Sequence, residues 1–199
     1  MKRTAAGNGA HTPPAGQPLD HLVDAYLKQQ GPRASSERDD FRSMDLKSAV
    51  TMAALGLRAD GRRHEHLRRI PQAALEECCN RLVSRLEAID RIASFDQLLD
   101  FIETVVGRPH EDEDRVHGVN EMYYYDAACA IANQLGLDID AVYLHRGTRE
   151  GAINLGLDGR LRSLKVSTLP EPLQQLAPGE VEDFLCVYKD EMRRFRARP

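Results

Sequence analysis

The sequence contains no tryptophan, only four cysteines, and no apolar run of the roughly 18 residues that a membrane-spanning helix needs. Its first residues carry two positive charges but no apolar stretch, so we expect no secretory signal. The cysteines have no metal-ligand spacing and are expected to be reduced, partly buried thiols. Together these absences favour a soluble, cytoplasmic protein with no membrane partner.

Recognisable catalytic signatures are missing too. The chain has no GxGxxG motif, no Walker-type loop and no serine in a nucleophile-elbow context. We therefore expect no cofactor and no bound metal, and the question of enzymatic activity stays open. The net charge of −4 also means that any affinity for nucleic acid has to come from a local basic patch.

What the chain does contain is repeated helical periodicity. Apolar residues recur at steps of three and four between capping residues and glycines, and no two segments carry a hairpin signal. This pattern predicts an all-α fold, a bundle of about seven or eight mostly short helices. We expect residues 18–199 to form this domain, either as one body or as two lobes, 18–93 and 94–199. Residues 1–17 are rich in small residues and proline and are expected to be a disordered tail.

The first helix boundaries follow from prolines, glycines and a capping aspartate. Residues 18–29 place apolar side chains on one face, and Gly31 and Pro32 are expected to end that helix. The polar residues 33–44 are predicted to be a loop, after which Asp45 caps the second helix.

A long helix is expected next. From Pro71 to residue 93, apolar residues recur at alternating steps of four and three, which predicts a packed core helix with Leu82 and Leu86 on its buried face. Ser94 then begins a capping box for the following helix, and Gly107 ends it.

Further capping residues divide the second half of the chain. Asn120 is expected to cap a helix that carries three consecutive tyrosines. At least one of them is expected in the core, and the pattern leaves room for one exposed tyrosine that stacks on a base or contacts a partner. Asp138 and Thr148 are predicted to cap two short helices. Residues 160–169 are expected to be a loop or a lone extended segment, and a final helix follows Pro178.

The most basic stretch is residues 58–69, where five arginines stand against two acids. Arginine binds phosphate through two parallel hydrogen bonds, and neighbouring histidines can add more. This stretch is therefore a candidate phosphate-binding site, made of Arg62, Arg63, His64, His66, Arg68 and Arg69. The alternatives are a solvated loop whose arginines pair with acids elsewhere and, less favoured, a metal site at 64–66 or at 110–117.

A second candidate site lies at residues 145–149. If Thr148 caps a helix, the free N–H groups and the dipole of that helix favour an anion. His145, Arg146 and Arg149 flank the same point, so these four residues are candidate phosphate ligands. An ordinary turn with a good cap explains the same residues and is the favoured of the two interpretations.

A third candidate lies at residues 116–157, where Val116 and Gly118 precede a helix rich in alanine. This arrangement resembles the helix-hairpin-helix unit of DNA-binding proteins and DNA glycosylases, over about a fifth of the chain. The resemblance implies an all-helical DNA-binding unit whose hairpin, at Gly118 and Asn120, contacts the DNA backbone.

Tyr143 stands where those glycosylases carry a catalytic aspartate, with His145 two residues later. A phenol is neutral at pH 7 and gives no electrostatic stabilisation to a positively charged transition state, so the resemblance implies binding without base release. More broadly, residues 59–71, 142–152 and 180–194 are similar to an uncharacterised family of bacterial proteins, which implies no activity.

The sequence therefore favours a nucleic-acid-associated protein that contacts the phosphate backbone, with DNA favoured as the partner and no catalysis. The runner-up is a helical adaptor that docks on another protein, and a glycosylase-like enzyme comes third. A geometric observation separates the first two. Nucleic-acid binding gains if residues 62–69, 118–120 and 145–149 share one face, and the adaptor gains if they are scattered. The oligomeric state stays open.

Overall fold

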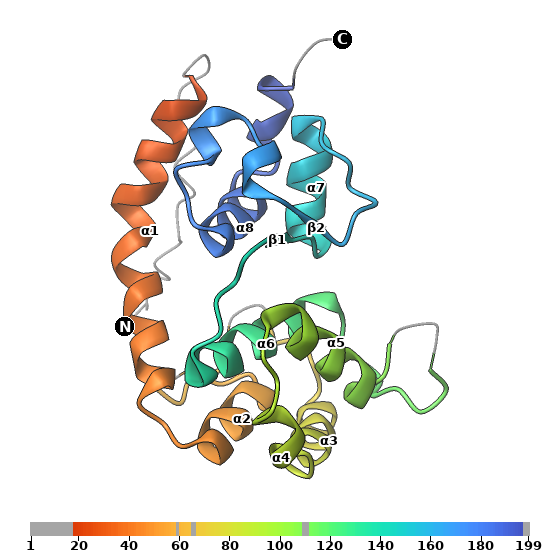
Figure 1. Ribbon diagram of the computed structural model, residues 1–199. Coiled ribbons are helices and arrows are strands. Elements are labelled where there is room, and N and C mark those ends of the chain that lie inside the picture. The colour runs from red at the N-terminus through yellow and green to blue at the C-terminus, as the bar shows by residue number, and fades with distance from the viewer. Residues whose placement is uncertain (1–17, 59, 65–66, 109–111, 197–199) are drawn as a thin grey trace, which may run out of the picture.

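The computed structural model describes residues 18–58, 60–64, 67–108 and 112–196, and within 30–40 it describes only the backbone. The described part contains eight α-helices and one two-stranded sheet (Figure 1), which confirms the all-α prediction. Within these ranges no helix is both long and apolar enough to cross a membrane.

The helices run in chain order as α1 Leu19–Arg42, α2 Leu46–Ala54, α3 Gln72–Val83, α4 Leu86–Ile89, α5 Phe95–Val106, α6 Glu121–Leu135, α7 Arg146–Leu155 and α8 Pro178–Val187. Three short 3-10 helices are η2 Val166–Thr168, η3 Glu171–Leu173 and η4 Glu191–Arg194. The strands β1 Val142–Tyr143 and β2 Ser163–Leu164 pair antiparallel.

The buried apolar side chains form two clusters. The first is built from α2 to α6 and contains buried residues between Phe41 and Tyr143. The second combines the start of α1 with the sheet, η3, α7 and α8. Figure 1 shows the two groups of helices one above the other, with α1 running beside both. The boundary between the two clusters does not fall at residue 93. The start of α1 packs with α7 and α8 in the second cluster, and the first cluster contains residues on both sides of residue 93.

The helix α1 is longer than the sequence indicates. The prediction that Gly31 and Pro32 end it, with residues 33–44 as a loop, is wrong, because the helix continues to Arg42. An interior proline removes a backbone hydrogen bond and normally breaks a helix. Here the start of α1 packs in the second cluster and Phe41, at its end, packs in the first, so packing at both ends outweighs the local signal.

Other local signals are confirmed. Asp45, Ser94 and Asn120 each accept a hydrogen bond from the backbone N–H of a residue two or three positions later, and thereby cap α2, α5 and α6. Gly107 ends α5 with a φ of 96°, and a Cβ at that position would lie 2.5 Å from the Cα of Arg115. Only glycine readily adopts this positive φ and also has no Cβ to clash with Arg115.

Two predicted caps are wrong. Asp138 does not begin a helix, because the chain there leads into β1. Thr148 lies inside the first turn of α7, which begins at Arg146 with His145 at the N-cap position. Residues 160–169 do have a partner strand, since β2 pairs with β1. That pairing joins segments separated by a whole helix, so no local turn signal announces it.

The long helix expected from Pro71 is interrupted. Arg85 has non-helical backbone angles, so the segment forms α3 and the single turn α4. Leu82 is fully buried in the first cluster, while Leu86 only packs against it.

We expect Leu82→Ala to lower the free energy of unfolding by about 2–5 kcal/mol, because the substitution leaves a cavity in a packed core. Leu86→Ala is the matched control and should cost clearly less, since this side chain is only partly buried. Urea unfolding of both variants measures the difference. If both variants lose the same free energy of unfolding, or if Leu82→Ala leaves the urea midpoint unchanged, then Leu82 is not the buried core residue that the structure shows.

Candidate functional site

Three stretches that are far apart in the sequence meet at one groove with a volume of about 840 Å³. We call it the arginine groove. It lies where the segment before α3, the start of α6 and one side of α7 come together. Its lining residues are Arg69, Ile70, Gly118, Asn120, Glu121, Met122, Arg146, Arg149, Glu150, Ile153 and Asn154.

The groove exists because the turn before α6 packs directly on the start of α3. Gly118 has a φ of 95°, and a Cβ there would lie 3.1 Å from the Cδ of Pro71. The close backbone approach brings Asn120 beside Arg69. Gly118 and Asn120 thus share the groove with Arg69 and with residues of α7, whereas the other described residues of 62–69 do not line it.

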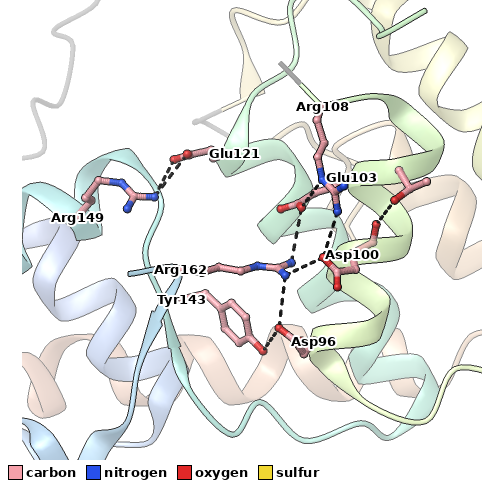
Figure 2. Close-up of polar contacts among 9 residues, drawn as sticks. Asp96, Asp100, Glu103, Arg108, Glu121, Tyr143, Arg149 and Arg162 are labelled. Atoms are coloured by element: carbon pink, nitrogen blue, oxygen red, sulfur yellow. Dashed lines mark hydrogen bonds and ion pairs between the residues drawn. The ribbon is translucent and has the colours of Figure 1, made fainter. Parts of the chain in front are cut away.

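The arginine side chains of the groove differ in what they contact. The guanidinium of Arg149 donates to the carbonyl oxygens of Leu144, Gly159 and Leu161 and lies 3.4 Å from a carboxylate oxygen of Glu121 (Figure 2). Its hydrogen bonds hold the loop after α7 against the end of β1. Arg149 is therefore a structural residue of the groove wall.

The side chains of Arg69 and Arg146 are exposed, and neither guanidinium group forms a hydrogen bond or an ion pair with any residue that the structure describes. The charge of Arg146 does act on Glu150, since it helps to lower the pKa of that carboxyl. The two acids of the groove are paired with other cations. Glu121 pairs with Arg149, and Glu150 lies 2.7 Å from the Lys189 Nζ, which lowers the pKa of the Glu150 carboxyl. The charges left for a ligand are thus the two exposed guanidinium groups.

The start of α7 contributes a side chain to the groove. Asn120 caps α6, but His145, the N-cap residue of α7, makes no capping hydrogen bond through its side chain. Of the first three residues of α7 only Arg146 lines the groove, because Gly147 packs on Cys186 and Thr148 is fully buried. The group that α7 offers to an anion at this place is therefore the Arg146 guanidinium.

The remaining arginines of the basic stretch contact the protein's own residues. Arg62 forms an exposed ion pair with Asp60 at 3.8 Å, and Arg63 donates to the carbonyl oxygen of Ile70 and to the side chain of Gln72. Among the residues of the stretch that the structure describes, only Arg69 lines the groove.

Two other predicted residues, Arg68 and His64, lie away from the groove. Arg68 is exposed outside the groove lining, and His64 lines a different cavity, between α1, α6 and α8. His66 lies outside the described residues. The metal sites considered at 64–66 and 110–117 fall partly outside them as well, and the described part holds no group of three side chains arranged to bind a metal ion.

His145 and Thr148 lie inside the protein, with exposures of 5% and 0%, out of reach of a phosphate group on the surface. The His145 ring contacts the Glu182 carboxylate through its Nε2, and the Thr148 hydroxyl donates to the same carboxylate at 2.8 Å. This contact ties the start of α7 to α8. The two residues are part of a buried polar cluster.

That cluster also includes Asp126 of α6. Burial, and secondarily the charge of Glu182, raises the pKa of Asp126 to about 7. Burial by itself disfavours the charged imidazole of His145, but the hydrogen bond and charge of Glu182 and the charge of Asp126 raise its pKa overall. Neither Asp126 nor Glu182 is among the candidate residues that the sequence indicates. No local pattern reveals either residue, because their contacts come from separate helices.

The three tyrosines of α6 are all buried, so none of them is exposed for stacking. Tyr123 donates its hydroxyl to the carbonyl oxygen of Ala54 at 2.9 Å, and Tyr124 donates to that of Gly107 at 2.7 Å. Both hydroxyls therefore fix the packing of α6 in the first cluster.

A network of ion pairs joins β2 to α5 (Figure 2). The Arg162 guanidinium lies 2.7 Å from Asp100 and within 4 Å of Asp96 and Glu103. Tyr143 donates its hydroxyl to Asp96 at 3.1 Å, and burial together with that carboxylate raises the pKa of the phenol. Tyr143 is thus a neutral residue that helps to hold the two clusters together.

The region that resembles a helix-hairpin-helix unit has a different local structure. Residues 107–120 separate α5 from α6, a longer connection than a tight hairpin, and β1 stands between α6 and α7. The geometry of the groove, and not this resemblance, is therefore the basis for a function. Comparison with protein-family models, with curated proteins and with solved structures finds no match for this chain.

Proposed function

We propose that this protein binds the phosphate backbone of a nucleic acid in the arginine groove, without catalysis. The observation that carries the proposal is the convergence of Arg69, residues 118–120 and Arg146 on one groove. These residues come from three separate parts of the chain, and the fold places them side by side.

The groove offers the groups that a phosphate needs. The exposed guanidinium groups of Arg69 and Arg146 supply charge-assisted hydrogen bonds. Ile70, Met122 and Ile153 line the same groove and provide apolar contact for sugars or bases. Arginine side chains bind the phosphates of DNA and of RNA alike, so the groove fits the backbone of either nucleic acid.

Base excision is not part of the proposal. The Tyr143 phenol is neutral and donates its hydrogen bond to Asp96, so it does not offer a carboxylate to a developing positive charge.

Docking on another protein remains the second candidate function. The Ile153 side chain is 49% exposed and gives the groove an apolar surface that a protein partner can contact. An apolar peptide would bind there through contacts that salt barely weakens, since burial of apolar surface does not depend on ionic strength as phosphate contacts do.

A salt titration tests the proposal. With two phosphate contacts, log K for a single-stranded oligonucleotide should fall against log salt concentration with a slope of about −1.4, and for a duplex of about −1.8. Fluorescence anisotropy from 20 to 300 mM KCl measures this slope. Absence of binding at 20 mM KCl contradicts the proposal, and so does salt-independent binding; capture of a protein partner that survives nuclease treatment would favour the adaptor.

A further inference from the structure

A second cavity, of about 250 Å³, lies at the junction between the two hydrophobic clusters. We call it the junction cavity. Its apolar walls come from both clusters, with Tyr26 of α1 on one side and Phe41, Tyr125 and Ile139 on the other. Small-molecule sites occur preferentially at such junctions between packed units, and this volume suits a ligand smaller than a typical drug.

The polar groups of the junction cavity are mainly hydrogen-bond acceptors. Four carboxylates line it, those of Asp126, Glu180, Glu182 and Asp183. No lysine or arginine lines it in the part of the chain that the structure describes, and the basic side chain of the lining is His64. Among the lining residues that the structure describes, carboxylates therefore outnumber basic groups, and they surround an aromatic interior.

The carboxylates of the cavity are not equally provided with partners. Glu182 accepts from Thr148 and contacts His145, and the charge of Asp183 acts on the hydroxyl of Tyr26, whose pKa is raised by burial and by that charge. The Oδ2 atom of Asp126, in contrast, is buried and has no hydrogen-bond partner. A buried carboxyl oxygen without a donor is costly, so this position calls for a donor from outside the protein.

We propose that the junction cavity binds a small organic cation, a protonated amine with a short aromatic or apolar part. The ammonium group donates to Asp126 and is attracted by the carboxylates of α8, while the apolar part packs on the tyrosine and phenylalanine rings. Aromatic faces attract cations as well as apolar groups, so the two kinds of wall favour the same ligand. The described side chains of the cavity are not arranged as a metal site, which leaves an organic cation as the matching class.

Binding of a cation should be linked to a proton. With its pKa at about 7, the Asp126 carboxyl is about half protonated at neutral pH, and a bound ammonium group favours its ionised form. The titratable groups that face it are His64 from the loop before α3, Tyr26 from α1, Tyr125 and Cys129 on α6, His145 before α7, and Glu182 and Asp183 on α8. An alkylamine stays protonated throughout, because its pKa lies near that of lysine, about 10.

The test uses phenethylamine hydrochloride and its neutral analogue 2-phenylethanol with the full-length protein in calorimetry. We expect the amine to bind at least tenfold more tightly than the alcohol. Its affinity should rise about tenfold from pH 6 to pH 8, following the ionised fraction of a group with a pKa of about 7. At pH 7 the heats in phosphate and Tris buffers should differ, because binding releases a proton.

The variant Asp126→Asn keeps the shape of the side chain and removes its charge. It should weaken amine binding about tenfold and abolish both the pH dependence and the buffer dependence. Asp138→Asn, an exposed change in the loop after α6, is the matched control and should bind as the parent does. No binding of the amine overturns the proposal, as does equal binding of the alcohol or the same pH dependence in Asp126→Asn. This proposal is independent of the arginine groove, because amine binding by the parent protein and by Asp126→Asn is measured without nucleic acid.

Discussion

The double variant Arg69→Ala with Arg146→Ala should bind an oligonucleotide roughly 100-fold more weakly than the parent at 50 mM salt. A hydrogen bond to a charged group contributes on the order of 1.5–3 kcal/mol, and loss of 1.4 kcal/mol is a tenfold loss of affinity. The lower end of that range, applied to both side chains, gives the expected factor. Both are exposed and unpaired among the described residues, so their removal should leave the fold intact.

The control for this variant removes two other exposed arginines. Arg62 pairs with Asp60, and Arg160 pairs with Asp158, both away from the groove lining. Arg62→Ala with Arg160→Ala changes the net charge of the protein by the same amount, yet we expect affinity within about threefold of the parent, since exposed pairs of this kind contribute little. If both double variants lose affinity equally, general charge and not the groove attracts the nucleic acid.

The second large effect concerns stability and pH. In the unfolded chain the Asp126 carboxyl has a pKa near 4, whereas burial raises it to about 7 in the folded protein. Between these values the folded state binds more protons than the unfolded state, so the free energy of unfolding falls as pH rises from about 4 to 7. The raised pKa of His145 acts in the same direction, because its contribution is present at low pH and is lost as pH rises through the folded value.

Asp126→Asn should therefore stabilise the protein at pH 8, by about 2–4 kcal/mol, where the upper figure is the full shift at 1.36 kcal/mol per unit. At pH 5 the gain should be clearly smaller, because most of the carboxyl is already protonated in the folded protein. Urea unfolding at the two pH values, with Asp138→Asn as the exposed control, measures both gains. A loss of stability at pH 8 would mean that the ionised carboxylate has a stabilising partner.

Sequence alone determined those parts of the fold that depend on neighbours a few residues away. The cap at Asn120, the buried face of α5 and the stop at Gly107 follow from side-chain chemistry within one turn of a helix. The start of α8 at Pro178 is equally local, because proline suits the first turn of a helix. Helical periodicity is a short-range property, so it is readable without the fold.

Tertiary structure decided the rest, because it depends on contacts between residues that are distant in the chain. Packing at both ends of α1 lets the helix continue past Pro32. The strand β2 pairs with β1, although α7 lies between the two strands in the sequence. Other long-range contacts bury His145 against Glu182. The Arg149 guanidinium donates hydrogen bonds to backbone carbonyl oxygens and is therefore not free to bind a ligand. An arginine in a sequence has the same chemistry whether it is paired or free. Only the fold leaves Arg69 and Arg146 exposed on one groove, since their surroundings come from three separate segments.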